Sequence, residues 1–295
     1  MKIGLYFQAD RELAEECRRI TGAEVEILPA GSTEVEVVQR QPVIGKETRI
    51  VQTLSAGVDH LDFKAIPHNI VVLSNAGAYS DTVAAHALAL LLAAVRKIIK
   101  FDSEIRNGQW NQTGADQIRG KTVGILGYGG IGKAFADLTR AMGANITAYS
   151  RSPVTDGNVK VVETLEELFS KSYVVLIAVP LTKSTRGLVG RSLLDSFQGR
   201  YIINVARSDI VDRNSMMEYL ERNPEKYYLS DVWWGEPRIT APIPQNVILT
   251  PHVAGMISEQ YYSLYAREYV LKAFENLGRY LKGEKSHVVN QDDYR

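Results

Sequence analysis

Short apolar runs alternate with helical segments along most of the chain. In the first part, an apolar run opens the sequence and a helical segment that ends near Ile20 follows it. The strands expected here are residues 2–7, 25–28, 50–54 and 71–73. Strands that alternate with helices in this way are typical of an open parallel sheet with helices on its faces. The chain is therefore expected to be an α/β protein.

A second strand–helix system begins at Thr122 and repeats this pattern. After its first strand, further strands are expected near residues 146–149, 174–179, 201–205, 227–229 and 247–249. Six strands with intervening helices suit a doubly wound nucleotide-binding domain. Between the two systems, Ser80 or Asp81 can cap a long helix that ends near Asn107.

The last helical segment, residues 258–282, comes after the sixth strand and is free to cross back onto the N-terminal part. We therefore expect a discontinuous first domain of residues 1–82 plus 258–295 and a second domain of residues 83–257. A chain of 295 residues is long enough for two domains of ordinary size with buried cores.

The charge balance points to a small-molecule partner. Lysine plus arginine and aspartate plus glutamate number 34 each, so the chain has no overall basic field. Such a field is what recruits nucleic acid or an anionic membrane surface. We therefore expect neither of these as a partner.

The compartment is expected to be the cytoplasm. The single cysteine, Cys17, can form no internal disulfide, which fits a reducing environment. The N-terminus reads as a short strand and has no apolar run long enough for a signal peptide. The most apolar segment, residues 83–99, is interrupted by His86, Arg96 and Lys97 and is shorter than the roughly 20 residues that span a bilayer.

A glycine fingerprint opens the second strand–helix system, with Gly127, Gly129 and Gly132 between an apolar strand and a helical segment. In that setting the first glycine allows a tight turn, the second lets backbone approach a pyrophosphate, and the third lets helix pack close to strand. The helix N-terminus, with Gly130 and Ile131, faces the anion. The alternative is an ordinary glycine-rich turn.

Several spaced motifs, taken together with the fingerprint, resemble the D-isomer-specific 2-hydroxyacid dehydrogenase family. They are Leu54-Ser-Ala-Gly57-Val-Asp59, Val179-Pro-Leu-Thr182, Asn204-Val-Ala-Arg207, Asp231-Val-Trp-Trp-Gly-Glu236-Pro237 and Thr250-Pro-His252. The resemblance covers nearly the whole chain in order. It implies two doubly wound parallel-sheet domains, a Rossmann nucleotide domain and a flavodoxin-like substrate domain, with a cleft between them.

The chemistry of this family needs groups that Arg207, Glu236 and His252 can supply. Reduction of a 2-oxo acid requires a hydride at C2, a proton on the oxygen and a held carboxylate. His252 follows an expected strand and suits proton exchange near neutral pH. Glu236 would fix its tautomer, and the planar fork of Arg207 would bind the carboxylate and polarise the carbonyl.

Each of these three residues also has an ordinary interpretation. Arg207 is also consistent with a surface cation after a strand, Glu236 with a solvated acid, and His252 with a polar residue that begins a helix. Their occurrence in family order favours the catalytic interpretation. The other histidines are expected to be solvated, except His86 in the apolar helix, which reads as a packed core or hinge residue.

Similarity to the family places the substrate carboxylate at Ser55, Ala56 and Gly57, where small residues would let backbone N–H groups converge. The alternative is an ordinary turn. The resemblance also implies cofactor contacts. They are expected at Thr82, Pro180, Ala206 and Asp231, the last of them to the nicotinamide carboxamide.

The segment after the second strand of the nucleotide domain favours NADP(H) over NAD(H). An NAD-specific site usually has an acid about 20 residues after the fingerprint, at the end of the next strand. Here that strand ends Ala148-Tyr149-Ser150-Arg151-Ser152, and no acid follows it before Asp156. Ser150 and Arg151 stand there instead and could hold a 2′-phosphate. The alternative is an exposed arginine beside a site that accepts NAD(H).

Two positions depart from the family pattern. Ser208 follows the proposed catalytic arginine where the family commonly has glycine, and Ala85 precedes the helix histidine where glutamate is common. The first change lies beside the expected site.

The sequence thus predicts a dimeric, NADP(H)-dependent reductase of a short 2-oxo acid, similar to glyoxylate and hydroxypyruvate reductases. A cofactor-sensing binding protein of the co-repressor type is the alternative, and the lack of charge-rich extensions disfavours it. A dehydrogenase for formate or an amino acid is a weaker alternative, because the related formate enzymes carry glutamine where Glu236 stands.

Overall fold

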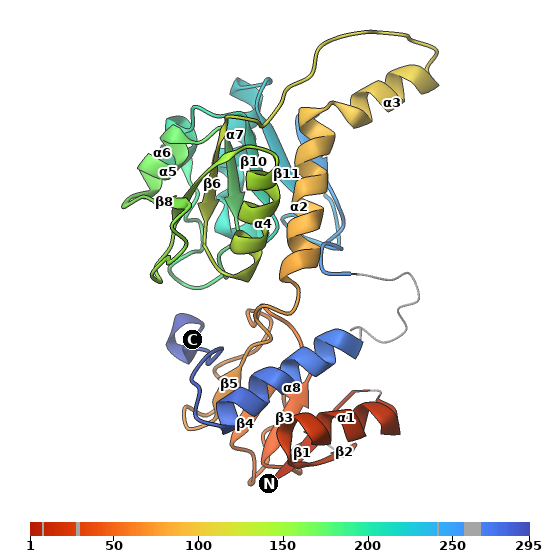
Figure 1. The fold of residues 1–295 in the computed structure, drawn as a ribbon, viewed down its shortest axis with the longest axis vertical. Helices are drawn as coiled ribbons and strands as arrows, with labels where there is room; N and C mark the ends of the chain where they lie inside the picture. The colour runs from red at the N-terminus through yellow and green to blue at the C-terminus, as the bar shows by residue number, and fades with distance from the viewer. Residues whose placement is uncertain (8, 28–29, 241, 257–266) are drawn as a thin grey trace. The chain divides into compact units, whose positions relative to one another are not determined.

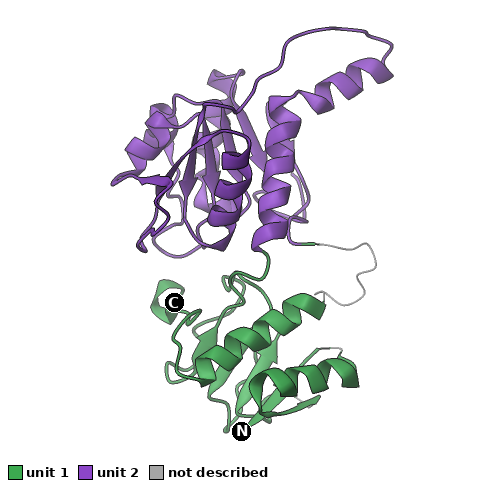
Figure 2. Cartoon of the chain, in the orientation of Figure 1, with its two compact units in different colours: residues 1–79, 256–295 green, residues 80–255 purple. Residues whose placement is uncertain are grey.

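The computed structural model describes residues 1–7, 9–27, 30–240, 242–256 and 267–295. It divides into two compact units, which Figure 2 colours separately. Unit 1 comprises Met1–Tyr79 and Met256–Arg295, and unit 2 comprises Ser80–Gly255. The domain boundaries expected at 82/83 and 257/258 stay a prediction, and residue 257 lies outside the described residues.

Unit 1 is built on a five-stranded parallel sheet. Its strands are β1 (Lys2–Leu5), β2 (Glu24–Ile27), β3 (Val35–Val38), β4 (Ile50–Thr53) and β5 (Val71–Leu73). They lie in the order β2-β1-β3-β4-β5, and every neighbouring pair is parallel. This is the flavodoxin-like strand order, as the sequence predicts. Leu28, which we expected in β2, lies outside the described residues.

Both faces of this sheet are buried, and β4 shows this, since its successive residues pack into two different hydrophobic clusters. Ile50 belongs to the cluster that includes Phe274 of helix α8, whereas Val51 packs with Phe63 on the other side. Helices α1 (Arg11–Thr21) and α8 (Arg267–Leu281) lie side by side against the sheet in Figure 1. Of the helix expected over residues 258–282, the part before Arg267 lies outside the described residues. A 3-10 turn, η2 (Gln291–Asp293), follows near the C-terminus.

Strand β3 was missing from the expected set. Its four residues are all buried, and they include the charged Glu36, which interrupts the apolar run. The Glu36 carboxylate accepts hydrogen bonds from the Gly31 amide (3.1 Å) and from the Thr33 and Thr48 hydroxyls (both 3.3 Å). A buried charge is tolerated when hydrogen bonds satisfy it, which is information that the local sequence does not carry.

Unit 2 is built on a seven-stranded parallel sheet of order β12-β11-β10-β9-β6-β7-β8. Its strands are β6 (Thr122–Leu126), β7 (Asn145–Tyr149), β8 (Val159–Val161), β9 (Val174–Ile177), β10 (Tyr201–Asn204), β11 (Tyr227–Ser230) and β12 (Val247–Leu249). Counted from β6, this is the doubly wound order 3-2-1-4-5-6 with a seventh strand added. The short edge strand β8 was not expected from the sequence.

Helices cover both faces of this sheet in Figure 1. They are α2 (Ser80–Val95), α4 (Gly130–Ala141), α5 (Leu165–Lys171), α6 (Arg191–Ser196) and α7 (Arg213–Arg222), and η1 (Ser208–Ile210) is a single 3-10 turn. Helix α2 packs against α4 on one face. The fold class predicted from the sequence is confirmed: two doubly wound parallel-sheet units.

The long helix expected after Ser80 is broken. Helix α2 ends at Val95, and Lys97 takes a left-handed φ of 54° before α3 (Ile98–Arg106) begins. Among the described residues, no single helix is long and apolar enough to cross a membrane; α2 and α3 meet the criterion only together, bent by 57° at this break.

Candidate active site

The carboxyl ends of six adjacent strands of unit 2 lie in register. Their last residues pair across the sheet in the order Leu249, Ser230, Asn204, Ile177, Leu126 and Tyr149. The loops that carry the expected nucleotide-binding and acid–base residues of unit 2 therefore start from one edge. Strand order turns back at β6, and in open α/β sheets ligands bind in the crevice outside the strand ends at such a switch point.

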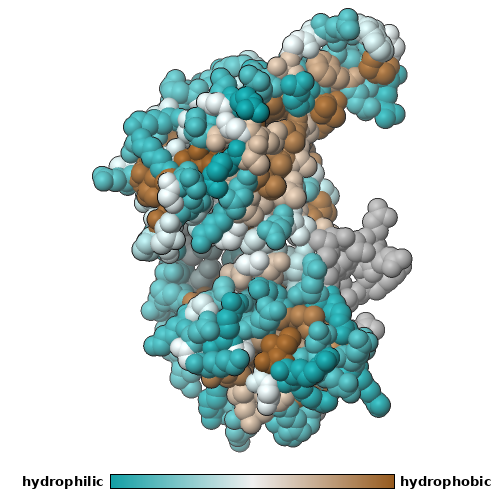
Figure 3. Space-filling model, viewed as in Figure 1, coloured by the Kyte–Doolittle hydropathy of each residue, from teal (hydrophilic) through white to brown (hydrophobic). Residues whose placement is uncertain are grey.

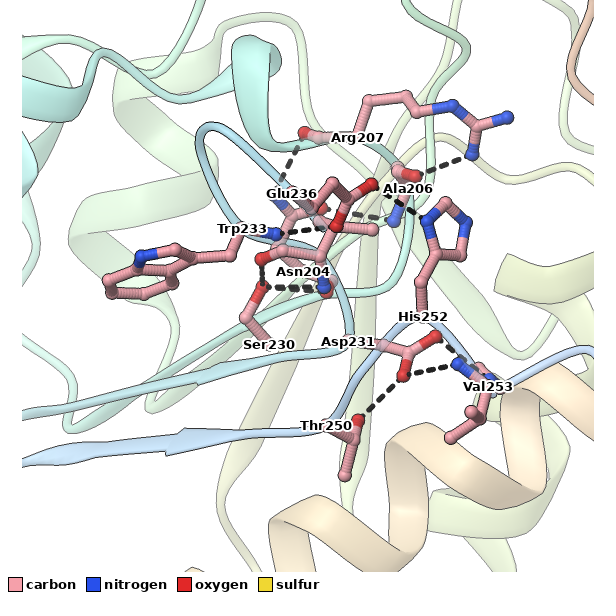
Figure 4. A network of polar contacts seen from close by, with 12 residues as sticks. Asn204, Ala206, Arg207, Ser230, Asp231, Trp233, Glu236, Thr250, His252 and Val253 are labelled. Atoms are coloured by element: carbon pink, nitrogen blue, oxygen red, sulfur yellow. Dashed lines mark hydrogen bonds and ion pairs between the residues drawn. The ribbon is translucent and has the colours of Figure 1, made fainter. Parts of the chain in front are cut away.

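His252 and Glu236 form a hydrogen-bonded pair at this edge (Figure 4). Nδ1 of His252 lies 2.8 Å from Oε1 of Glu236, and the Trp233 amide donates to Oε2 at 3.0 Å. A carboxylate accepts hydrogen bonds, so Nδ1 carries the proton in this pair. The other ring nitrogen, Nε2, is left to exchange a proton with a ligand. The His252 side chain is 47% exposed, which keeps Nε2 within reach of a ligand.

The backbone of His252 is held in an unusual conformation. Its φ is 57°, in the left-handed region that costs a non-glycine residue about 1–3 kcal/mol. The His252 amide donates to the carbonyl oxygen of Asp231 at 2.9 Å. The Asp231 carboxylate accepts the next two amides, those of Val253 (3.0 Å) and Ala254 (2.8 Å). Asp231 is thus the anchor that holds the loop in this conformation.

Arg207 is positioned by Asn204, the last residue of β10. The Asn204 side-chain amide donates to the Arg207 carbonyl (2.9 Å) and to the Tyr228 hydroxyl (3.0 Å). Its carbonyl oxygen accepts the Ala206 amide at 3.0 Å. Asn204 is fully buried, so these bonds fix the turn into the Arg207 loop. No role of its own was predicted for Asn204 from the sequence. The feature that could have indicated its supporting role is its place as a polar residue at the end of an apolar, buried strand.

The glycine fingerprint has the geometry of a pyrophosphate cradle. Gly127 has a φ of 99°, and a Cβ added to Gly132 would lie 2.3 Å from the Gly127 carbonyl oxygen, so turn and helix are in close contact. A Cβ on Gly129 would meet nothing within 4 Å, which leaves open space beside that backbone. The first amides of α4 have no acceptor within the helix and suit an anion. These residues fit a dinucleotide.

A cavity of about 370 Å³ adjoins this cradle. Gly127, Gly129, Ser150, Arg151 and Pro180, all expected as cofactor residues, line it together with ten further residues. Thr185, which sequence reasoning missed, is one of these. Its hydroxyl donates to the Pro180 carbonyl at 2.6 Å and accepts the Thr182 amide at 2.8 Å. The feature of the sequence that could have indicated this turn is the pair of threonines, Thr182 and Thr185, three residues apart after Pro180.

The remaining expected residues lie elsewhere. Ser55, Ala56 and Gly57 follow β4 in unit 1, and Thr82 lies in the first turn of α2 in unit 2. The Leu54 carbonyl, just before Ser55, accepts the Tyr79 hydroxyl at 2.6 Å. The Ser55 hydroxyl oxygen is buried and has no hydrogen-bond partner in the part of the chain that the structure describes. It is therefore available to a ligand.

A second pocket, of about 340 Å³, lies beside the acid–base pair. It is lined by Trp233, Glu236, Pro237, Ile239, Leu249, Thr250, Pro251 and His252. The pair is therefore next to a hollow with apolar walls rather than on a flat surface.

Comparison with known proteins agrees with this geometry. The family model for the NAD binding domain of D-isomer specific 2-hydroxyacid dehydrogenases matches residues 88–254. The chain belongs to this family. It is therefore a dehydrogenase that acts with a nicotinamide cofactor, and the family predicted from the sequence is confirmed.

Individual relatives carry related names. A D-3-phosphoglycerate dehydrogenase from Archaeoglobus fulgidus is 32% identical over 77% of this chain, but the match spans only 44% of that protein. A hydroxypyruvate reductase from Thermotoga maritima is 33% identical over 79% of each chain. The crystal structure of a glycerate dehydrogenase related protein from Thermoplasma acidophilum is 41% identical, with a TM-score of 0.71 over 95% of this chain and 100% of that one. These names do not favour the cofactor-sensing alternative.

Two of the three fingerprint glycines, Gly129 and Gly132, give a matched test of the cradle. Gly132→Ala places a methyl group against backbone, which has little room to move, so we expect lower stability and weaker cofactor binding together. Gly129→Ala meets open space, so the free energy of unfolding should stay within about 1 kcal/mol of wild type while cofactor affinity falls. Urea unfolding and fluorescence titration with NADPH separate the two effects. Unchanged NADPH affinity in Gly129→Ala would show that this loop does not bind the pyrophosphate of the cofactor.

Proposed function

We propose that the protein reduces a short 2-oxo acid, such as hydroxypyruvate or glyoxylate, with NADPH, and oxidises the corresponding D-2-hydroxy acid in reverse. The observation that carries this proposal is the Glu236–His252 pair, at the same sheet edge as the glycine cradle. The relative from Thermotoga maritima that is named hydroxypyruvate reductase supports the substrate class.

In the proposed reaction the chain supplies the proton and the electrostatic stabilisation. Bound reduced nicotinamide supplies the hydride to C2 of the substrate. Nε2 of His252 gives its proton to the carbonyl oxygen as the C2–H bond forms, so the alcohol leaves the site neutral. Glu236 stabilises the charged imidazole through Nδ1, at 2.8 Å. Arg207 binds the substrate carboxylate and polarises the carbonyl.

The carboxylate end of the substrate is assigned to a second group of residues. We propose that Ser55, Ala56 and Gly57 bind it through backbone amides and the Ser55 hydroxyl. The buried hydroxyl without a hydrogen-bond partner among the described residues supports this role for Ser55. Thr82, Ala206 and Asp231 are proposed as cofactor contacts. The Oδ2 oxygen of Asp231 accepts the Ala254 amide at 2.8 Å, and its second lone pair can accept a carboxamide donor.

Removal of the acid–base or carboxylate-binding group should abolish most turnover. In His252→Ala and Arg207→Ala, NADPH oxidation with hydroxypyruvate should fall by about 10² to 10⁴, the usual contribution of a positioned acid–base group. His68→Ala, at an exposed loop position of unit 1, is the control and should keep wild-type kcat. A wild-type rate in either site variant would remove that residue from the mechanism.

The charges around the cofactor cavity support the proposed preference for NADP(H). Among the described residues that line it, Arg151 is the one charged side chain. Asp156, the first acid after β7, already has hydrogen-bond partners. Its carboxylate accepts the Asn158 amide (2.9 Å), the Tyr128 hydroxyl (2.8 Å) and the Arg140 guanidinium (2.8 Å), which lower its pKa to about 2. Its charge is thus balanced locally, and a 2′-phosphate meets Arg151 without a free carboxylate to repel it.

Arg151→Ala should therefore act on one cofactor only. We expect kcat/KM for NADPH to fall by about 10- to 100-fold, the scale of one charge-assisted hydrogen bond, while kcat/KM for NADH changes little. Arg213→Ala, an exposed arginine on α7, is the matched control. Equal losses with both cofactors, or a wild-type preference for NADH, would refute the proposed selectivity.

We also propose that two copies of the chain associate through α3. This helix has no buried residues and projects from the rest of unit 2 (Figure 1), and apolar atoms lie on its exposed surface (Figure 3). Ile98, Ile105 and Trp110 are 56%, 52% and 79% exposed. A groove of about 500 Å³ runs between Ile105 and Trp110. The charges of α3 balance within the helix, through Lys100–Glu104 and Arg106–Asp102 pairs, so an identical copy meets no net repulsion.

Sedimentation tests this interface. The variant Ile105→Asp with Trp110→Ala should sediment as a monomer at concentrations where wild type is a dimer, because it places a charge in the apolar surface. Val161→Asp, at an apolar residue of β8 that is 49% exposed, should remain dimeric. A wild-type protein that stays monomeric at high concentration would contradict the proposal.

The location of the enzyme in the cytoplasm, finally, is proposed from its single, buried, free cysteine.

A further inference from the structure

A chain of polar contacts links the middle of helix α2 to the loop of His252. His86 interrupts an otherwise apolar part of α2, and its Nε2 lies 2.8 Å from the Thr250 hydroxyl. Thr250 in turn donates to Oδ1 of Asp231 at 2.6 Å. The His86 side chain is 22% exposed and that of Asp231 is 3% exposed, so solvent competes little for these bonds.

The direction of each bond in this chain follows from the number of protons available. Thr250 has one hydroxyl proton, and the Asp231 carboxylate takes it. The Thr250 oxygen can then only accept from His86, which therefore carries its proton on Nε2. The same Nε2 lies 3.5 Å from Oδ1 of Asp231, so the two groups also attract each other when His86 is charged.

Asp231 is the point where this chain meets the catalytic loop. Its Oδ1 oxygen is shared by the Thr250 hydroxyl and the Val253 amide, and Oδ2 accepts the Ala254 amide (Figure 4). The backbone between these contacts includes His252 with its left-handed φ of 57°. A strained conformation of this kind persists only when surrounding contacts over-determine it. The orientation of the Asp231 carboxylate is therefore one of the constraints on where the imidazole lies.

We propose that His86 is a positioning residue for the reaction: through Thr250 and Asp231 it holds the loop that presents the His252 imidazole. This inference rests on the proposed function for its kinetic consequence. A histidine at this place costs desolvation that an apolar residue of α2 would avoid, and its contacts with Thr250 and Asp231 offset that cost. Without the Nε2–H donor, the Thr250 hydroxyl loses its fixed orientation and Asp231 loses a rigid neighbour.

Two pairs of variants test the chain of contacts at both of its links. His86→Leu removes the donor at similar volume, whereas His86→Gln keeps an amide N–H in nearly the same place. Thr250→Val removes the hydroxyl, whereas Thr250→Ser keeps it. We expect kcat for hydroxypyruvate reduction to fall about tenfold or more in His86→Leu and Thr250→Val, with the KM for hydroxypyruvate within about twofold of wild type. Glutamine and serine should restore most of kcat.

The double variant His86→Leu with Thr250→Val distinguishes positioning from independent damage. Because both residues act through one chain of bonds, its kcat should equal that of either single variant, whereas independent effects would multiply. A wild-type kcat in His86→Leu, or equal losses in His86→Leu and His86→Gln, would overturn the inference.

A measurement without turnover keeps this test separate from the proposed function. The backbone amide resonances of Val253 and Ala254, which donate to Asp231, should shift in His86→Leu and stay near their wild-type positions in His86→Gln. If wild-type protein binds NADPH but reduces no 2-oxo acid, the proposed function fails while these shifts still decide the role of His86. Unshifted resonances in His86→Leu would refute positioning regardless of activity.

Discussion

The site depends on one constraint, the common register of parallel strands at the carboxyl edge of the unit 2 sheet. Parallel pairing sets Leu249 beside Ser230 and Ser230 beside Asn204, so the loops after these strands begin at neighbouring points. Arg207, Glu236 and His252 lie far apart in the sequence but leave from the same edge as the glycine cradle. A slip of one residue in any of these strands would move each of its side chains to the opposite face of the sheet and into the wrong core, so core packing enforces the register that the chemistry needs.

Polar side chains at the strand ends convert this edge into a defined geometry. Asn204 fixes the turn before Arg207, Asp231 holds the loop of His252, and the Trp233 amide orients Glu236. All three use buried or half-buried hydrogen bonds to backbone, where a lost partner costs more than at the surface. The functional side chains thus stand on loops, and two of these loops are held by Asn204, the last residue of β10, and by Asp231, the residue directly after β11. This is how flexible segments can carry an exact arrangement of acid, base and cation.

Much of this architecture was predictable from local patterns. The apolar runs identified most strands, and the fingerprint between strand and helix identified the nucleotide unit. Its glycines are predictable from local sequence because the turn itself requires a positive φ at Gly127 and close packing at Gly132. Strand β3 escaped because Glu36 is buried through contacts with Gly31, Thr33 and Thr48 that only the fold creates. The break at Lys97 escaped because helix propensity continues across it.

The polar supports of the site were the harder part to predict. Asp231 was expected as a cofactor contact, and the structure adds its bonds to Val253 and Ala254, which depend on how the loop returns to the strand. His86 was expected to be a packed core or hinge residue. Its bond to Thr250 joins residues 164 positions apart, a separation over which sequence patterns carry no signal.

A crystal structure with NADP⁺ and D-glycerate is the direct test of whether the cradle and His252 form one site at this sheet edge. We expect the pyrophosphate at Gly129–Gly132 and the substrate C2 hydroxyl within hydrogen-bond distance of His252 Nε2; a pyrophosphate bound elsewhere, or a substrate without contact to His252, would contradict the proposed site.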